Sequence, residues 1–90
     1  MGVVAIIARI MPDSPNANLE QIEKEARSKL ESEGAMNISF SIEPVAFGLK
    51  AVKAKFAWKE EKSTEIVESI LSSIPNVSSA TIEDYRRAFG

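Results

Sequence analysis

The pattern of hydrophobic and polar positions divides the chain into six segments and predicts four strands. Residues 2–11, GVVAIIARIM, form a continuous apolar and β-branched run, which is typical of a strand in the middle of a sheet. Residues 36–43 (MNISFSIE) and 49–58 (LKAVKAKFAW) alternate between two faces, as half-buried strands do. Residues 78–85 (SSATIEDY) predict a last short strand, and we expect residues 86–90 to form a basic and aromatic tail.

Two helices are predicted between these strands. The first repeats apolar residues with helical spacing, begins after the N-cap candidate Asn18, has Gln21 as its capping-box partner and ends at Gly34. Its apolar face consists of Leu19, Ile22, Ala26 and Leu30. The second is capped by Ser63 or Thr64 and ended by Pro75. Its apolar face consists of Ile66, Val67, Ile70, Leu71 and Ile74.

The order strand, helix, strand, strand, helix, strand is that of a split βαβ unit. Right-handed crossovers then put both helices on one face of a four-stranded antiparallel sheet. We therefore expect one domain, residues 1–90, with the α+β class and a ferredoxin-like βαββαβ sandwich of strand order 4-1-3-2. Such a sandwich leaves the other face of its sheet uncovered.

Composition narrows the possible chemistry. The 90 residues contain no cysteine and no histidine, which excludes disulfides and thiolate sites and removes the usual general base near pH 7. Glu83 and Asp84 are adjacent in a predicted strand, so we expect them to point to opposite faces and not to form a catalytic pair. We therefore expect no enzyme activity, no cofactor and no metal. The apolar run VVAII is too short to span a membrane, and we expect a soluble, cytoplasmic protein.

The uncovered sheet face is the first candidate surface. The alternation puts on it Val3, Ala5, Ile7 and Arg9, then Leu49, Ala51, Lys53 and Lys55, and finally Thr81, Glu83 and Tyr85. A patch this apolar, with Lys and Arg among its members, suggests a protein interface, a homodimer contact or a tolerated surface of small residues. Direct binding of nucleic acid is not expected, because the net charge is −2 and Phe56 falls on the core face.

The segment EPVAFGLKAV, residues 43–52, resembles the signature of the nucleotide-exchange domain of elongation factor 1-beta in its short archaeal form. The resemblance covers the whole chain and includes the opening VVAIIARIMPDSP and the acidic residues followed by Arg86 and Arg87. It implies a protein that binds elongation factor 1-alpha and promotes exchange of its GDP for GTP during translation. The alternative is a regulatory or small-molecule-binding module that dimerises through its open sheet face; a monomer is favoured.

The resemblance also implies contact residues. Phe47 would dock on the second domain of the GTPase, with Gly48 allowing the turn and Pro44 fixing its approach; packing of Phe47 beside the helices is the alternative. Lys50 would help to attract acidic parts of the partner. Eukaryotic members end in a Lys that reaches toward the magnesium and phosphate region. Its position falls on Arg87, with Arg86 as rival and a solvated tail as the alternative.

Overall fold

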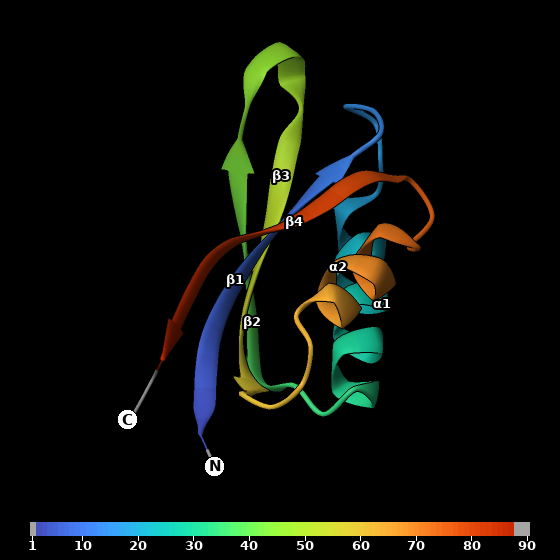
Figure 1. The fold of residues 1–90 in the computed structure, drawn as a ribbon. Coiled ribbons are helices and arrows are strands. Elements are labelled where there is room, and N and C mark those ends of the chain that lie inside the picture. The colour runs from blue at the N-terminus through green and yellow to red at the C-terminus, as the bar shows by residue number, and fades with distance from the viewer. Residues whose placement is uncertain (1, 88–90) are drawn as a thin grey trace.

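In the computed structural model, which describes residues 2–87, a four-stranded sheet carries two helices on one side (Figure 1). The elements in chain order are strand β1 (Val3–Pro12), helix α1 (Leu19–Ser32), strand β2 (Met36–Pro44), strand β3 (Lys50–Lys59), helix α2 (Glu65–Ser72) and strand β4 (Val77–Arg87). The strands lie in the order β2-β3-β1-β4, and each pairs antiparallel with its neighbour. The predicted ferredoxin-like α+β sandwich and its strand order 4-1-3-2 are confirmed.

Helix α1 has the predicted ends. The Asn18 side chain accepts a hydrogen bond of 3.1 Å from the Gln21 amide and so caps the first turn. Gly34 has φ 94°, and the following amide of Ala35 donates to the Leu30 carbonyl at 3.0 Å. A glycine in the left-handed region with this bond is the usual C-terminal motif of a helix, so the sequence fixes both ends of α1 locally.

Helix α2 is shorter than predicted. The Glu65 amide donates to the Ser63 hydroxyl at 3.2 Å, so Ser63 supplies the side-chain bond at the first turn. The helix ends at Ser72, and Ile74 therefore lies in the turn after it. Ile74 is nevertheless buried in the core. Its burial, not its place in a helix, explains why it continues the apolar pattern.

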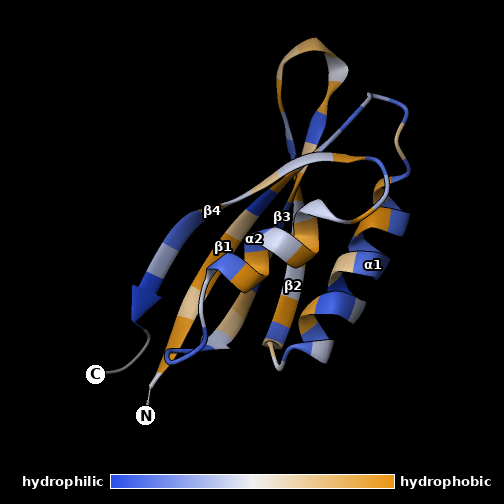
Figure 2. Cartoon of the chain, turned by 45° about the vertical axis from the view of Figure 1, so that its right-hand side comes forward, coloured by the Kyte–Doolittle hydropathy of each residue, from blue (hydrophilic) through white to orange (hydrophobic). Residues whose placement is uncertain are grey.

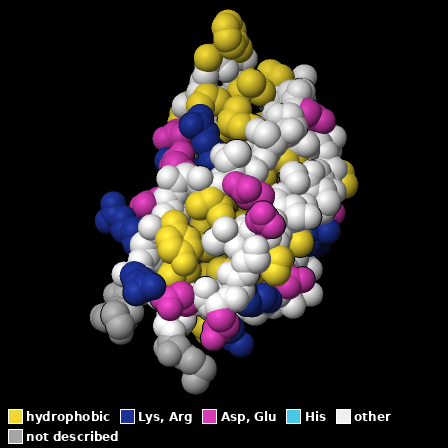
Figure 3. Space-filling view, viewed as in Figure 1, with side chains coloured by type: hydrophobic (Ala, Val, Ile, Leu, Met, Phe, Trp, Pro, Cys, Tyr) yellow, Lys and Arg dark blue, Asp and Glu magenta, His cyan; other side chains and the backbone are white. Residues whose placement is uncertain are grey.

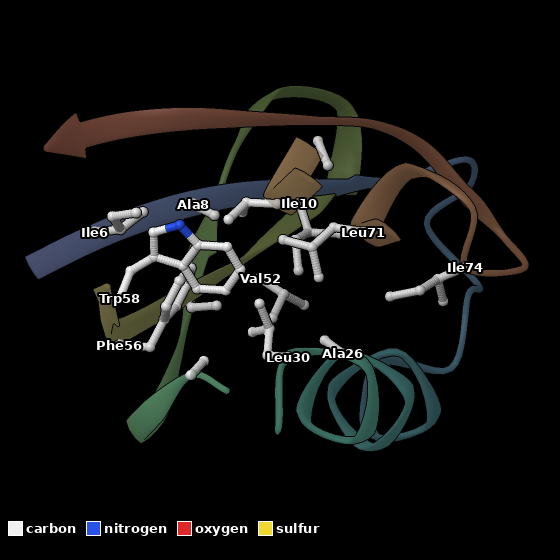
Figure 4. Close-up of a cluster of buried hydrophobic side chains, with 14 of the residues drawn as sticks. Ile6, Ala8, Ile10, Ala26, Leu30, Val52, Phe56, Trp58, Leu71 and Ile74 are labelled. Carbon is white, nitrogen blue, oxygen red and sulfur yellow. The ribbon is translucent and has the colours of Figure 1, made fainter. Parts of the chain in front are cut away.

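The core lies between the helices and one face of the sheet (Figure 4). Every second residue of β1 is buried, and β3 contributes its alternate residues, including Phe56 and Trp58. These two rings meet edge to face, with centroids 5.9 Å apart and planes at 75°. The indole N–H of Trp58 donates to the Lys62 carbonyl at 3.3 Å, so this large side chain is buried with its polar atom satisfied.

Strand β4 continues further than predicted. Its pairing with β1 includes Ala5 opposite Arg86 and Val4 opposite Arg87, so both arginines belong to the sheet and not to a tail. This last part of β4 is hydrophilic (Figure 2), and the pairing with β1 rather than burial keeps it extended. Residues 88–90 of the expected tail lie outside the described residues.

The hairpin of β2 and β3 projects beyond the other strands at one end of the molecule (Figure 1). Hydrophobic side chains gather at this projecting end (Figure 3). The two strands pair regularly from Ser39 opposite Lys55 to Pro44 opposite Lys50. Before Ser39 the register is interrupted: Asn37 has φ 56°, and Met36 is 46% exposed instead of following the inward face of β2.

Candidate partner-binding site

A single 3₁₀ turn, Ala46–Gly48, connects β2 to β3 and carries Phe47 at its centre. The Val45 amide donates to the Leu49 carbonyl at 2.8 Å, and the Leu49 amide donates to the Ala46 carbonyl at 3.2 Å. Phe47 has φ 61° and ψ 31°, a left-handed conformation that costs a residue with a Cβ about 1–2 kcal/mol. It is 94% exposed. The turn therefore holds a large aromatic side chain in water, away from the core.

The residues around Phe47 stand close together at the same tip. Gly48 has φ 77°, and a Cβ at this position would lie 3.8 Å from the Pro15 Cβ, which is an ordinary contact. The backbone conformation, not lack of space, thus favours glycine here. Pro44 lies opposite Lys50 at the last pair of the hairpin, and both are exposed. The tip therefore unites four of the predicted contact residues, Pro44, Phe47, Gly48 and Lys50.

The two arginines predicted as rivals lie side by side in β4 but on opposite faces of the sheet. Arg86 is opposite Ala5, on the open face, and its Nε lies 3.0 Å from a carboxylate oxygen of Asp84. Arg87 is opposite Val4, on the helix side, and its Nε lies 2.9 Å from a carboxylate oxygen of Glu60. Both side chains are mostly exposed, so each ion pair can open at little cost.

The arginines and the aromatic tip lie at opposite ends of the sheet (Figure 1). Arg87 shares its row of the sheet with Val4 and Trp58, whereas the tip follows the start of β3. Nine residues of extended chain separate Trp58 from Leu49, which corresponds to about 30 Å. The longest dimension of the molecule is 41 Å. A partner that contacts both sites must therefore span nearly the full length of this domain.

The open sheet face carries a network of four charged residues that the sequence did not predict. Lys53 lies 2.8 Å from Glu83 and 3.2 Å from Glu43, and Arg9 lies 3.9 Å and 3.8 Å from the same two carboxylates. One residue comes from each strand. The hydrogen bond to Glu83, and next the one to Glu43, raises the pKa of the Lys53 ammonium above its ordinary value of 10.5. Two of the three cations predicted on this face, Arg9 and Lys53, are thus paired with carboxylates within the domain.

A β-bulge in β4 changes which residues reach this face. Ile7 pairs with Asp84 but Ala8 pairs with Ile82, so Glu83 is an extra residue between them. Glu83 bonds to Lys53 on the open face, and Asp84 lines a hollow on that same face. The prediction that these two carboxylates point to opposite faces is therefore wrong. Tyr85, predicted on the open face, lies opposite Ile6 on the helix side, where it lines a hollow with residues of α2.

Two further properties concern the described residues 2–87. No group of three or more His, Cys, Asp or Glu side chains among them is placed to hold a metal ion. Within the same range, neither helix is long and apolar enough to cross a membrane.

The sequence matches known proteins over nearly its full length. The profile of the EF-1 guanine nucleotide exchange domain matches residues 5–88. An elongation factor 1-beta of Methanocella arvoryzae is 38% identical over 90 residues, which cover 99% of this chain and 100% of the relative. Those of Methanocorpusculum labreanum and Aeropyrum pernix are 34% and 35% identical, and each alignment covers 97% of this chain and 98% of the relative.

Proposed function

Since the chain belongs to the family of EF-1 guanine nucleotide exchange domains, we propose that it binds elongation factor 1-alpha and promotes exchange of GDP for GTP. The proposed activity consists of binding, and no bond is made or broken by this chain. Its place of action is the cytoplasm, where translation takes place. The observation that carries the proposal is the exposed aromatic tip, a surface feature that folding alone does not require.

Phe47 is the proposed anchor. Its ring is held in water by a strained turn, and burying it against a partner would recover hydrophobic free energy that the isolated domain leaves unused. Full burial of a Phe side chain is worth about 1.5–3 kcal/mol. Pro44 and Gly48 set the direction of the tip, and Lys50 places a positive charge beside it. The proposed site therefore combines one apolar anchor with local attraction for acidic groups.

At the other end of the sheet, we propose that Arg87 approaches the magnesium and phosphate region of the GTPase. It would exchange its carboxylate partner Glu60 for groups of the nucleotide site. Arg86 is the alternative, and because the two side chains occupy opposite faces, one docking pose can present only one of them. With anchor and arginine about 30 Å apart, the domain would bridge two parts of the GTPase.

Exchange then follows from linkage between two ligands of the GTPase. If bound exchange factor weakens the hold on GDP, bound nucleotide must weaken the hold on the exchange factor by the same coupling free energy. Bound factor therefore lowers the affinity of the GTPase for GDP, and GTP lowers the affinity for the factor and displaces it. The proposed faster release requires in addition that the factor lower the barrier to GDP dissociation.

Stopped-flow release of a fluorescent GDP analogue from the cognate elongation factor 1-alpha tests this proposal. We expect acceleration that saturates with concentration. Phe47→Ala should raise the half-saturating concentration by about 10- to 150-fold, the equivalent of the burial energy above. Arg87→Met should lower the saturating rate, whereas Arg86→Met serves as its matched control. Absence of any acceleration by the folded protein would refute the proposal, and a loss with Arg86→Met alone would exchange the roles of the arginines.

A further inference from the structure

The two edges of the sheet differ in how they are protected against further strand pairing. Edge strand β4 has two register shifts, and the charged residues Glu83, Asp84, Arg86 and Arg87 lie at its end. In its uncharged part, Val77–Ile82, the Ile82 amide donates to the Glu68 carboxylate of α2 at 3.0 Å. Such features discourage association. Edge strand β2 contains the uncharged segment Ile38–Ile42, ISFSI, with Ile42 41% exposed. β-branched and aromatic residues without charge favour strand pairing. The β2 edge is therefore the open one.

The hydrogen bonds of the hairpin show which backbone groups point outward from β2. The Val45 amide bonds to the Leu49 carbonyl, so the pairs that bond inward continue every second residue and include Ser41–Lys53 and Ser39–Lys55. The amides and carbonyls of Phe40 and Ile42 then face away from β3. The Ile38 carbonyl also faces away from β3, because it accepts a hydrogen bond from Arg27 of α1 at 3.4 Å.

The sequence of this edge reads the same in both directions. In an antiparallel pairing of two copies about Phe40, Ile38 lies opposite Ile42 of the other copy, and Ser39 lies opposite Ser41. Phe40 lies opposite Phe40. Because the outward groups belong to residues 38, 40 and 42, this register also places donors against acceptors at each of these positions, once Arg27 releases the Ile38 carbonyl that it contacts at 3.4 Å within one chain. Side chains and backbone are thus self-complementary in a single register.

Helix α1 adds a second self-complementary pattern beside this edge. Arg27 bonds to the Ile38 carbonyl and lies over the Phe40 ring at 5.3 Å. It shares a hollow of ≈ 330 Å³ with Glu20, Glu23, Lys24 and Phe40, so two carboxylates and two cations meet there. α1 runs antiparallel to β2, so its two glutamates lie further toward Ile42. A two-fold axis at Phe40 would therefore bring Arg27 of one copy toward Glu20 and Glu23 of the other.

We propose that two copies of this protein associate through β2, with antiparallel strands centred on Phe40 and with α1 helices paired by charge. One short strand and one helix face form a smaller contact than a standard interface of about 800 Å² per partner. We therefore expect a weak dimer that forms at high protein concentration. In this arrangement the hairpin tips point in opposite directions, because the paired strands are antiparallel. Both Phe47 turns stay accessible, and the dimer is independent of the proposed exchange function.

Sedimentation velocity and amide hydrogen exchange up to about 1 mM protein, a concentration suited to weak association, test the proposal together. We expect the mass to rise toward twice that of one chain. At the same time the amides of Ile38, Phe40 and Ile42 should gain protection, while those of Ser39 and Ser41, already bonded within the sheet, should not change. A constant monomer mass, or protection confined to another surface, would overturn the proposal.

A charge exchange tests the register itself. In Ser39→Glu/Ser41→Glu, each new carboxylate lies beside Lys55 or Lys53 of its own chain, which supports the fold, but faces a second carboxylate across the axis. This variant should remain a monomer. In Ser39→Glu/Ser41→Lys, opposite charges meet across the axis, and dimerisation should persist. Salt of about 0.15 M limits long-range repulsion to about 8 Å. Equal association of the two folded variants would contradict the proposed register.

Discussion

Lys62 joins three segments, and its removal should cost more than that of an ordinary surface lysine. Its Nζ lies 3.1 Å from the Oε1 of Glu33 at the end of α1, bonds to the Glu33 carbonyl, and lies 4.9 Å from the centroid of the Trp58 ring. Lys62→Met keeps most of the aliphatic stem and removes the ammonium. The ion pair is partly exposed and contributes about 0.5–1 kcal/mol, and the contact with the ring contributes about 0.5–1 kcal/mol.

The bond to the Glu33 carbonyl adds about 1 kcal/mol, so we expect Lys62→Met to lower the free energy of unfolding by about 2–3 kcal/mol. For a domain of this size each kcal/mol corresponds to about 4–8 °C in Tm. Urea and thermal unfolding measure this change. Lys59→Met is the matched control, because Lys59 is exposed and has no ion pair among the described residues; it should change stability by less than about 0.5 kcal/mol.

A double-mutant cycle with Glu33→Gln separates the contributions of Lys62. The coupling between the two side chains should not exceed about 1 kcal/mol, because the carbonyl and the indole ring still bind the ammonium when the carboxylate is gone. If Lys62→Met and Lys59→Met lower stability equally, the inference that Lys62 holds α1 against the turn after β3 is refuted.

Three further changes follow from local features. Asn18→Ala removes the cap of α1 and should lower the free energy of urea unfolding by about 1 kcal/mol; no change would show that water replaces the side chain fully. Gly48→Ala forces a Cβ into φ 77° and should cost about 1 kcal/mol in the same measurement; a stabilised variant would mean that the turn relaxes. The pKa of Lys53 is raised in the folded state above the ordinary lysine value of 10.5. Its contribution to the free energy of unfolding is therefore complete below pH 10.5 and is lost at higher pH, as Lys53 of the folded protein deprotonates. Wild type should therefore lose stability above this pH more steeply than Lys53→Gln; parallel curves would contradict the network.

The order of elements and the core residues could be predicted because both follow from the spacing of apolar residues over a few positions of the chain. The alternation of β1 and β3 and the apolar face of α1 each require burial of one face, so a shift by one residue would expose the whole set. The ends of α1 could also be predicted, because the capping residues Asn18 and Gly34 act through hydrogen bonds to neighbouring residues. The tip residues were predicted because a family signature marks them, not because the pattern explains an exposed Phe47.

The composition of the open sheet face could not be predicted because it depends on one inserted residue. The bulge at Glu83 involves no glycine or proline, so nothing in the local sequence marks it. It reverses the facing of Asp84 and Tyr85, and it puts Glu83 within reach of Lys53. Strand β4 likewise continues to Arg87 because its last residues pair with Val4 and Ala5 of β1. The local sequence of residues 86 and 87 does not show this pairing, because the partner strand is distant in the chain.

The left-handed turn at Phe47 fixes the backbone during folding, so the loss of conformational entropy is not incurred when a partner binds. An aromatic side chain on a flexible loop would lose backbone freedom at the moment of contact, at about 1–2 kcal/mol for each residue that becomes ordered. Here two hydrogen bonds already fix the turn in the free protein. A partner would meet a preorganised ring, and the encounter would need no loop closure before docking. The rigidity of the free turn would therefore add to affinity for a partner, because the ordering cost is met during folding.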